Sequence, residues 1–423
     1  MSFLRAALAG AACLLCVATA VASPAGADAP VPSIASPLQG AVRVVWDASP
    51  DIQAARADVE AAQARVRAAS QPVYNPSLSL DAENADVDRR TAGLSLPLDV
   101  SGKRRARTLQ ADAEWRSREA TYELLRREVA SRWLKSWSAA ALASRQRELG
   151  EHRVALMRRF DALAAERLAV GDISSPERDL AALALGESQI QQASLDGSEA
   201  AALAALDAIA GDAVKSAPLL PAGLPPVSNG IAPLPLDERP ELVKARAGEA
   251  AAQAGIDVAR RARLPDPTIS LTGGRVRTGT GSDQVIGLSV SIPLPVLNSG
   301  RAEIDAALAE AGAAAAMVRS RQLATQASLR EARSRYDALR TAGEAFRQGR
   351  AAAFDDRAAL LEKLWRAGEI STSDYLVQLK QSLDTALSAL ALESQAWQAW
   401  FDYLTAAGRL TDWLDGRTQD VSP

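Results

Sequence analysis

The same order of sequence segments occurs twice along the chain, and this duplication limits what the chain can fold into. Five segments of the first half recur in the second half in the same order, at residues 50–52 and 240–242, 75–80 and 266–271, 93–98 and 287–294, 102–104 and 300–301, and 171–174 and 368–371. The offsets between matching segments lie between 190 and 198 residues, so each copy is too long to be a solenoid repeat. The sequence therefore predicts a duplicated structural unit.

The first residues have the features of a secretory signal peptide, which we expect to occupy residues 1–27. Arg5 precedes an apolar run over residues 6–21, and small residues that suit cleavage follow it. Both cysteines of the chain, Cys13 and Cys16, lie inside this segment, and neither is preceded by the leucine that an acylation site needs. The mature chain is then free of cysteine, which excludes disulfides and thiolate metal sites.

Charge and hydropathy exclude several classes of protein. The chain has 48 basic and 51 acidic residues, so nothing points to nucleic acid. No stretch after the signal segment reaches the ~18 uncharged apolar residues of a spanning helix. The single histidine, His152, lies between charged neighbours and is interpreted as part of a solvated helix face. One histidine without thiols supports neither a catalytic triad nor a transition-metal site, so we expect no enzyme, no cofactor and no bound metal.

Prolines divide the chain. Those in residues 28–50 predict an extended lead-in, and seven between residues 217 and 240 forbid a continuous helix. The predicted organisation is a lead-in at 28–50, a first repeat at 51–211, a proline-rich linker at 212–240, a second repeat at 241–410 and a C-terminal tail at 411–423.

Each repeat opens with a helix and a predicted β-hairpin, at residues 76–98 and 267–293. Apolar residues alternate there with small polar ones, as at Leu78, Leu80 and Ala82. Such alternation fits a sheet with one apolar and one wet face, in a soluble protein or in a transmembrane β-barrel. The glycines Gly273, Gly274 and Gly279 are interpreted as the turn of the second hairpin.

Long helical hairpins follow, at residues 103–210 and 301–408. The stretches 103–170 and 301–367 contain no proline, and apolar residues recur every seven positions, as at Leu142, Leu149, Leu156, Leu163 and Val170. This period predicts long helices that pack along one another. Trp133, Trp137, Trp397 and Trp400 are expected to pack between helices. The predicted fold class is mainly α with a small β part.

The turn of each helical hairpin has matching chemistry. Gly171 and Gly368 tolerate the positive φ at which a helix stops, and Ser174 and Ser371 can cap the returning helix. One interpretation of these residues is that they form turns and nothing more.

At this point the chain resembles the TolC-like outer membrane factors, over residues 45–410. Residues 287–301, Gly-Leu-Ser-Val-Ser-Ile-Pro-Leu-Pro-Val-Leu-Asn-Ser-Gly-Arg, resemble a pattern of the cobalt–zinc–cadmium branch, which partners resistance-nodulation-division pumps. Residues 368–376, Gly-Glu-Ile-Ser-Thr-Ser-Asp-Tyr-Leu, are similar to the family's periplasmic turn. The resemblance implies a homotrimer with a helical periplasmic tunnel and a twelve-stranded outer-membrane barrel, to which each protomer gives four strands.

The resemblance also implies roles for the turns. The adaptor-docking tip is expected at Gly171, Asp172, Ile173, Ser174, Gly368, Glu369, Ile370 and Ser371. Asp172, Glu369 and Asp374 are candidates for acidic rings at an aperture, with Arg366 and Arg178 as salt-bridge partners that close it. The alternative is that these charges are merely solvated.

The function that this resemblance implies is passive conduction across the outer membrane of a Gram-negative bacterium. The partners would be a second and third copy of the chain, outer-membrane lipid, a periplasmic adaptor (membrane fusion protein) and an inner-membrane pump. Divalent cations such as cobalt, zinc or cadmium are the expected cargo, and organic toxicants or drugs are the alternative. A periplasmic adaptor or coiled-coil scaffold is the third interpretation.

Overall fold

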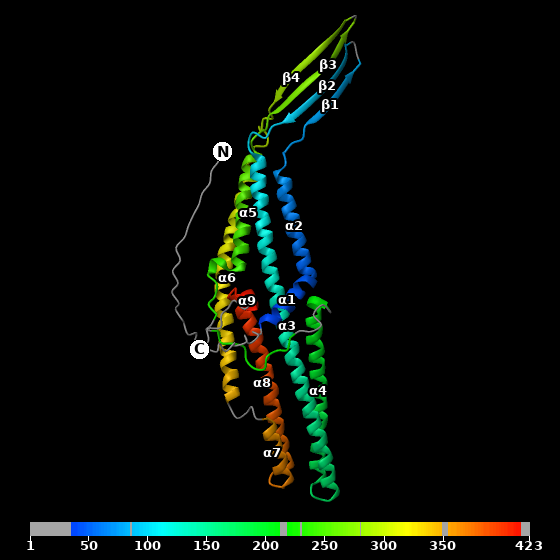
Figure 1. Ribbon diagram of the computed structural model, residues 1–423, viewed down its shortest axis with the longest axis vertical. Helices are drawn as coiled ribbons and strands as arrows, with labels where there is room; N and C mark the ends of the chain where they lie inside the picture. The colour runs from blue at the N-terminus through cyan, green and yellow to red at the C-terminus, as the bar shows by residue number, and fades with distance from the viewer. Residues whose placement is uncertain are drawn as a thin grey trace, which may run out of the picture.

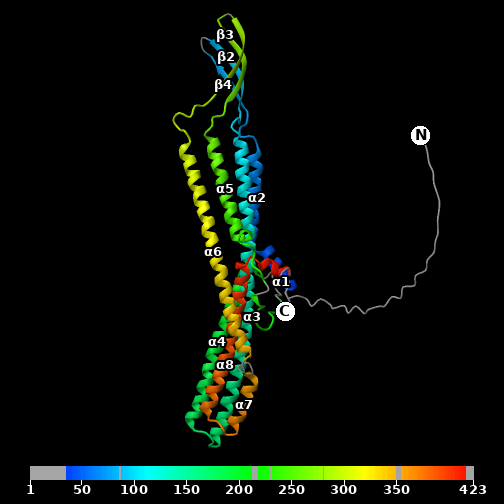
Figure 2. The same ribbon diagram turned by 90° about the vertical axis from the view of Figure 1, so that its left-hand side faces the viewer.

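The computed structural model describes residues 35–84, 87–211, 218–228, 231–279, 281–348 and 354–415. Its long helical body carries a four-stranded antiparallel sheet at one end (Figure 1, Figure 2). The expectation of a mainly helical fold with a small β part is confirmed. The predicted signal peptide at 1–27 lies outside the described residues.

The two repeats have the same order of elements, a helix, two strands and a long helical hairpin. The first contains α2 (Pro50–Ser70), β1 (Ser77–Glu83), β2 (Val87–Pro97), α3 (Lys103–Ala169) and α4 (Ser175–Ala210), after a preceding helix α1 (Ala35–Ala48). The second contains α5 (Pro240–Ala262), β3 (Thr268–Thr278), β4 (Gly281–Ser291), α6 (Arg301–Gln348), α7 (Phe354–Arg366) and α8 (Thr372–Ala406), followed by α9 (Leu410–Leu414). A short 3₁₀ helix, η3 (Leu236–Glu238), precedes α5.

The sheet has the strand order β1–β2–β3–β4, so the two repeats meet where β2 pairs with β3. Antiparallel partners such as Leu94 and Leu271 point to the same face of a sheet. The register therefore gathers one set of large apolar side chains on one face, all of them exposed: Leu78, Leu80, Leu94, Leu96, Ile269, Leu271, Ile286, Leu288 and Val290. Serine, threonine and glycine dominate the other face.

Two glycines were expected in a turn and lie instead inside β3. Gly273 pairs with Ala92 and Gly274 with Thr91, whereas Gly279, with φ of 55°, follows the end of the strand. A Cβ atom on Gly274 would lie 2.1 Å from the carbonyl oxygen of Arg90. Glycine is needed there because the backbones of β2 and β3 approach each other closely.

A buried ionic cluster joins the sheet to the helices. Lys103 Nζ lies 2.9 Å from Asp266 Oδ2, the hydroxyl of Tyr74 donates to the same oxygen at 2.8 Å, and Ser101 Oγ donates to Oδ1 at 3.2 Å. Burial raises the pKa of Asp266, but the hydrogen bonds from Lys103 and Tyr74 outweigh it, so the pKa lies below its usual value. The carboxylate is therefore held charged at the base of the strands.

The main core lies halfway along the helices. Trp133 and Trp137 stack with ring centroids 6.2 Å apart, and Trp400 lies 5.0 Å from the ring of Tyr336. Trp397 belongs to the same buried cluster, so the expected packing of these tryptophans between helices is confirmed. Indole and phenol groups bury large apolar areas while keeping one polar atom to be paired.

The proline-rich linker is tied to this core through its backbone carbonyls. Trp137 Nε1 donates to Pro218 O at 2.9 Å, Trp397 Nε1 donates to Gly223 O at 3.0 Å, and the hydroxyl of Tyr403 donates to Ile231 O at 2.9 Å. Arginine side chains bind further carbonyls at Leu220, Pro225 and Ala232. The carbonyls of this segment are not paired in a helix or sheet, so side chains of α3, α6 and α8, and Arg409 between α8 and α9, donate to them instead.

Two terminal expectations need correction. Residues 35–48 of the expected extended lead-in form α1, because Pro37 falls in the first turn, where a helix needs no amide donor. Leu38, Val42 and Val45 of α1 are buried in the main core. The expected C-terminal tail begins with α9, whose Leu410 and Leu414 are buried in the same core.

The long helices follow the predicted seven-residue stripe in part. Leu142 is fully buried and Leu149, Leu156 and Leu163 pack against a second core, but Val170 at the end of the stripe is 77 % exposed. In the second repeat α6 and α7 lie on either side of residues 349–353, which are outside the described residues. Across the described part of the chain, no helix is both long and apolar enough to cross a membrane.

Candidate functional site

The turns of the two helical hairpins lie at the same end of the molecule, opposite the sheet (Figure 1, Figure 2). We call the α3–α4 turn (residues 170–174) and the α7–α8 turn (residues 367–371) the two tips. The expected docking residues are thus brought together, although they are nearly two hundred residues apart in the chain.

Both tips have the same backbone geometry. Gly171 has φ of 80° and Gly368 has φ of 75°. The amide of Gly171 donates to Leu168 O and that of the next residue, Asp172, to Arg167 O, at 3.0 and 2.9 Å. The amides of Gly368 and Glu369 repeat these two bonds, each at 3.0 Å. This pair of bonds is the Schellman motif, which satisfies the last carbonyls of a helix and needs a left-handed residue.

The returning helices are capped as the sequence predicts. The amide and the hydroxyl of Ser174 both donate to Glu177 Oε2 at 2.8 Å. These bonds from Ser174 hold the pKa of the Glu177 carboxyl below its usual value. At the second tip Ser371 Oγ accepts from the amide of Asp374 at 3.0 Å and donates to its Oδ2 at 2.8 Å. Asp374, expected to face an aperture, therefore also belongs to the cap of α8.

Beneath the tips lies an aromatic cluster that the sequence analysis did not identify. The ring of Phe160 on α3 lies 4.7 Å from that of Trp365 and 4.8 Å from that of Tyr375. Trp365 Nε1 donates to Thr372 Oγ1 at 3.2 Å. Burial raises the pKa of Tyr375 to about 12, so its phenol stays neutral. The cluster joins α3, α7 and α8 and holds the two tips together.

The charges at the tips are paired differently from the expectation. Arg178 pairs with Asp161 at 2.9 Å and Arg366 with Glu362 at 2.6 Å, and neither pairs with an acidic residue of the turns. The guanidinium of Arg167, which the sequence analysis did not single out, pairs with Asp172 at 3.5 Å.

Arg167 also connects the two tips. Its Nη1 donates to Trp365 O at 3.3 Å, and its guanidinium carbon lies 4.9 Å from the centre of the Trp365 ring. A planar cation over an indole is a favourable arrangement, so Arg167 links the end of α3 to the end of α7. Its position three residues before the predicted turn is the only sequence signal for this role.

The predicted docking residues differ in exposure. Gly171, Asp172, Ser174, Gly368, Glu369 and Ser371 are exposed. Ile173 and Ile370 are half-buried and pack against the buried cluster beneath the tips that contains Phe160, Trp365 and Tyr375. Each tip therefore presents a polar surface anchored from below by one isoleucine.

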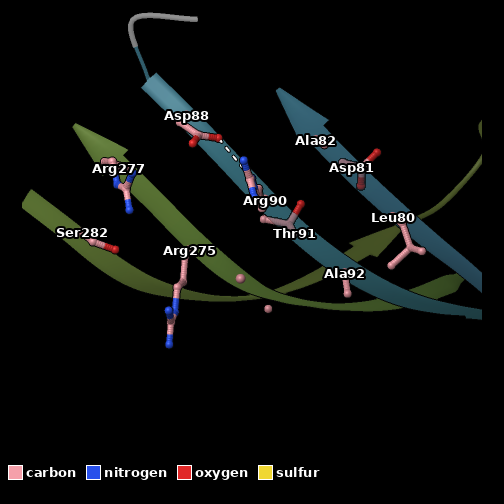
Figure 3. A pocket seen from close by; sticks show the side chains of 12 residues that line it. Leu80, Asp81, Ala82, Asp88, Arg90, Thr91, Ala92, Arg275, Arg277 and Ser282 are labelled. Carbon is pink, nitrogen blue, oxygen red and sulfur yellow. Dashed lines mark ion pairs between the residues drawn. The ribbon is translucent and has the colours of Figure 1, made fainter. Parts of the chain in front are cut away.

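Charges on the sheet separate by face near the ends of the strands that are farthest from the helices. In the strand register Arg90 lies opposite Arg275, and Asp88 lies opposite Arg277, so these four residues share the apolar face. They line a hollow of about 640 Å³ (Figure 3). The register puts the remaining charges on the polar face, namely Asp81, Glu83, Arg89 and Asp283. Within the described residues, no three or more His, Cys, Asp or Glu side chains are placed to hold a metal ion.

Known proteins share this sequence pattern and fold. The family model "outer membrane efflux protein" matches residues 45–212 and 233–409, and the gap falls within the linker. The cobalt-zinc-cadmium resistance protein CzcC of Cupriavidus metallidurans is 26 % identical over 245 residues, which are 56 % of this chain and 58 % of CzcC. The protein CyaE of Bordetella pertussis is 28 % identical over 302 residues, which are 64 % of this chain and 63 % of CyaE.

The chain thus spans less than two thirds of each of these curated relatives. The crystal structure of the CmeC outer membrane channel of Campylobacter jejuni superposes with a TM-score of 0.74 at 16 % identity, covering 91 % of this chain and 90 % of CmeC. The duplicated β-hairpin and helical hairpin are therefore a fold that known channels share. On the match of the family model to both repeats, the chain belongs to the outer membrane efflux protein family.

Proposed function

We propose that three copies of this chain form a passive duct through the outer membrane of a Gram-negative bacterium. The observation that carries the proposal is the sheet, which has one face of exposed large apolar side chains and two edge strands, β1 and β4. In water such a sheet would aggregate through its face and its edges. In a bilayer the apolar face meets lipid, and the edges are satisfied when β4 of one copy pairs with β1 of the next.

The tips are the surface that we propose meets the periplasmic adaptor, which connects the duct to an inner-membrane pump. They lie at the end opposite the sheet and expose polar turns on a rigid aromatic base. Rigid turns keep their shape on docking, so little ordering entropy is lost. The energy for transport comes from the pump, because the duct itself only conducts.

We further propose that the tips form the aperture of the duct. Glu369 and Asp374 are exposed acidic residues at one tip, and a trimer repeats each of them three times. Like charges that converge on an axis repel one another and attract cations. Arg167 opposes this repulsion within each copy, because it ties Asp172 to the neighbouring tip.

Divalent metal cations are the cargo that we propose. The similarity to CzcC supports this choice. The charges of the polar sheet face support it independently, since Asp81, Glu83 and Asp283 outnumber Arg89 there. A lumen lined by net negative charge raises the local concentration of cations.

Growth of a deletion strain tests the duct and its cargo together. The strain is grown on zinc, cadmium, cobalt, nickel and copper, and on a panel of organic toxicants, with the wild-type gene restored as control. Sensitivity confined to the divalent cations is the predicted result. Sensitivity to the organic compounds alone would be consistent with a duct and would contradict the cation cargo.

Extraction of the protein tests the duct separately. Release of the protein with the periplasm, without detergent, would indicate a soluble scaffold and contradict the duct.

A further inference from the structure

Three arginines on the apolar face of the sheet have no role in the duct described above. Register rows on this face run from Leu96, Ile269 and Val290 near the helices to Leu80, Ala92 and Ile286 farther out. The next row contains Arg90 and Arg275, and the row after it contains Arg277. The apolar face is therefore bordered at its far end by guanidinium groups.

The arginines lie close to the apolar rows. Successive rows on one face are two residues apart, which is about 7 Å along a strand. The Cα atoms of Arg90 and Arg275 thus lie about one row beyond the last apolar row, and that of Arg277 about two rows beyond it. A lipid that covers the apolar rows with its chains has its headgroup at this level.

The side chains are available to a ligand. Arg275 and Arg277 are exposed, and the side chain of Arg90 is 78 % exposed. Asp88 lies 3.5 Å from Arg90 and is the acidic residue among the charges that the register puts on this face (Figure 3). The face therefore has an excess of two positive charges, whereas Asp81, Glu83, Arg89 and Asp283 give the opposite face an excess of two negative charges.

We propose that Arg90, Arg275 and Arg277 bind the phosphate groups of anionic lipid headgroups in the outer leaflet. The proposal rests on the proposed function, because it needs the apolar face to meet lipid. Guanidinium groups bind phosphate oxygens through two parallel hydrogen bonds, and arginine stays charged at this boundary. The lipid is chosen over a protein partner because the cationic rows continue the apolar face directly.

The test uses the purified full-length protein in a neutral detergent. It is titrated with diphosphoryl lipid A, with monophosphoryl lipid A and with inorganic phosphate, and bound lipid is counted by native mass spectrometry. The variant carries Arg90→Gln, Arg275→Gln and Arg277→Gln together. Arg89→Gln is the control for the opposite face: it removes one positive charge from the neighbouring residue of β2, whereas the triple variant removes three.

The wild-type protein should bind diphosphoryl lipid A more tightly than monophosphoryl lipid A, and inorganic phosphate least. The triple variant should lose about tenfold or more in affinity for diphosphoryl lipid A, and Arg89→Gln should change it less than about twofold. Equal affinity of the triple variant and the wild type, or an equal loss in Arg89→Gln, overturns the proposal. Phosphate binding as tight as lipid A would also overturn it, since the ligand would then be a free anion.

Oligomeric state separates this inference from the proposed function. If the protein in detergent is a conducting trimer but the triple variant binds lipid A as tightly as the wild type, the proposed duct is supported and the headgroup site is contradicted. If the protein is a monomer that needs no detergent, both the duct and the headgroup site are contradicted, because the apolar face then meets no lipid.

Discussion

Replacing Gly171 by alanine tests the account of the tips quantitatively. Gly171 has φ of 80°, and a Cβ atom there would have nothing within 4 Å, so backbone strain is the only penalty. A left-handed conformation costs an alanine about 1–2 kcal/mol. Alanine also lowers the conformational entropy of the unfolded chain relative to glycine, which stabilises the folded state by about 0.4–1 kcal/mol. We therefore expect Gly171→Ala to destabilise the first tip by about 1 kcal/mol.

Gly197 in α4 is the matched control. It also has nothing within 4 Å of a built Cβ atom, but it lies inside a helix and its φ is not positive. Alanine there should stabilise the helix by about 0.5–1 kcal/mol, the opposite sign.

Hydrogen exchange of peptides around the first tip and around residue 197 of α4, read by mass spectrometry on the full protein, measures the two changes. The opening constant at the tip should rise about fivefold in Gly171→Ala and fall in α4 of Gly197→Ala. Gly171→Asn should lie between the wild type and Gly171→Ala, since asparagine tolerates the left-handed region. Equal protection in Gly171→Ala and the wild type would show that this turn does not need a residue that tolerates a positive φ.

Trp365→Ala should lower the local unfolding free energy of the tips by about 3–5 kcal/mol, measured by the same exchange experiment, and Trp365→Phe by much less because it keeps a ring. Burial raises the pKa of Asp266 but its hydrogen bonds lower it further, so its contribution to stability is present above the unfolded pKa near 3.9 and is lost as pH falls through the folded pKa. The melting temperature of Asp266→Asn should therefore lie below that of the wild type at neutral pH and approach it below about pH 4. Glu369→Ala with Asp374→Ala should lower cation conductance in a planar bilayer, because it removes the acidic groups that repel one another across the aperture and attract cations. Ser371→Ala, which removes a cap but no charge, should change conductance much less; equal conductance of the double variant and the wild type would contradict the acidic aperture.

Local chemistry explains why much of the fold could be predicted. The alternation at Leu78 and Leu80 and the glycines that end α3 and α7 are set by neighbours in sequence, so the hairpins and tips were found in the right order. The capping roles of Ser174 and Ser371 follow from the same short-range rules.

Contacts between distant segments explain what was missed. Leu38 and Val45 of α1 are buried in a core to which distant helices such as α3 and α8 contribute, whereas the nearby prolines predict an extended segment from the local sequence alone. Arg167 meets Trp365 across 198 residues of sequence, and Phe160 meets Tyr375 in the same way. Arg178 and Arg366 found closer acidic partners on their own hairpins than the turn residues assigned to them. Pairing of this kind depends on which faces the helices bury, which one sequence does not reveal.

The proposed trimer requires that β4 of one copy pairs with β1 of the next to close a barrel. Residues 28–423 contain no cysteine, and Cys13 and Cys16 are replaced by serine so that introduced cysteines report without background. Ser79→Cys on β1 is combined in turn with Val285→Cys, Gly287→Cys and Ser289→Cys on β4, all on the polar face by register. The two strands are opposite edges of the sheet in one chain, so a disulfide between them needs a neighbouring copy. At least one pair should yield a covalent trimer on a denaturing gel after mild oxidation; a chain that stays monomeric with every pair would contradict strand pairing between copies.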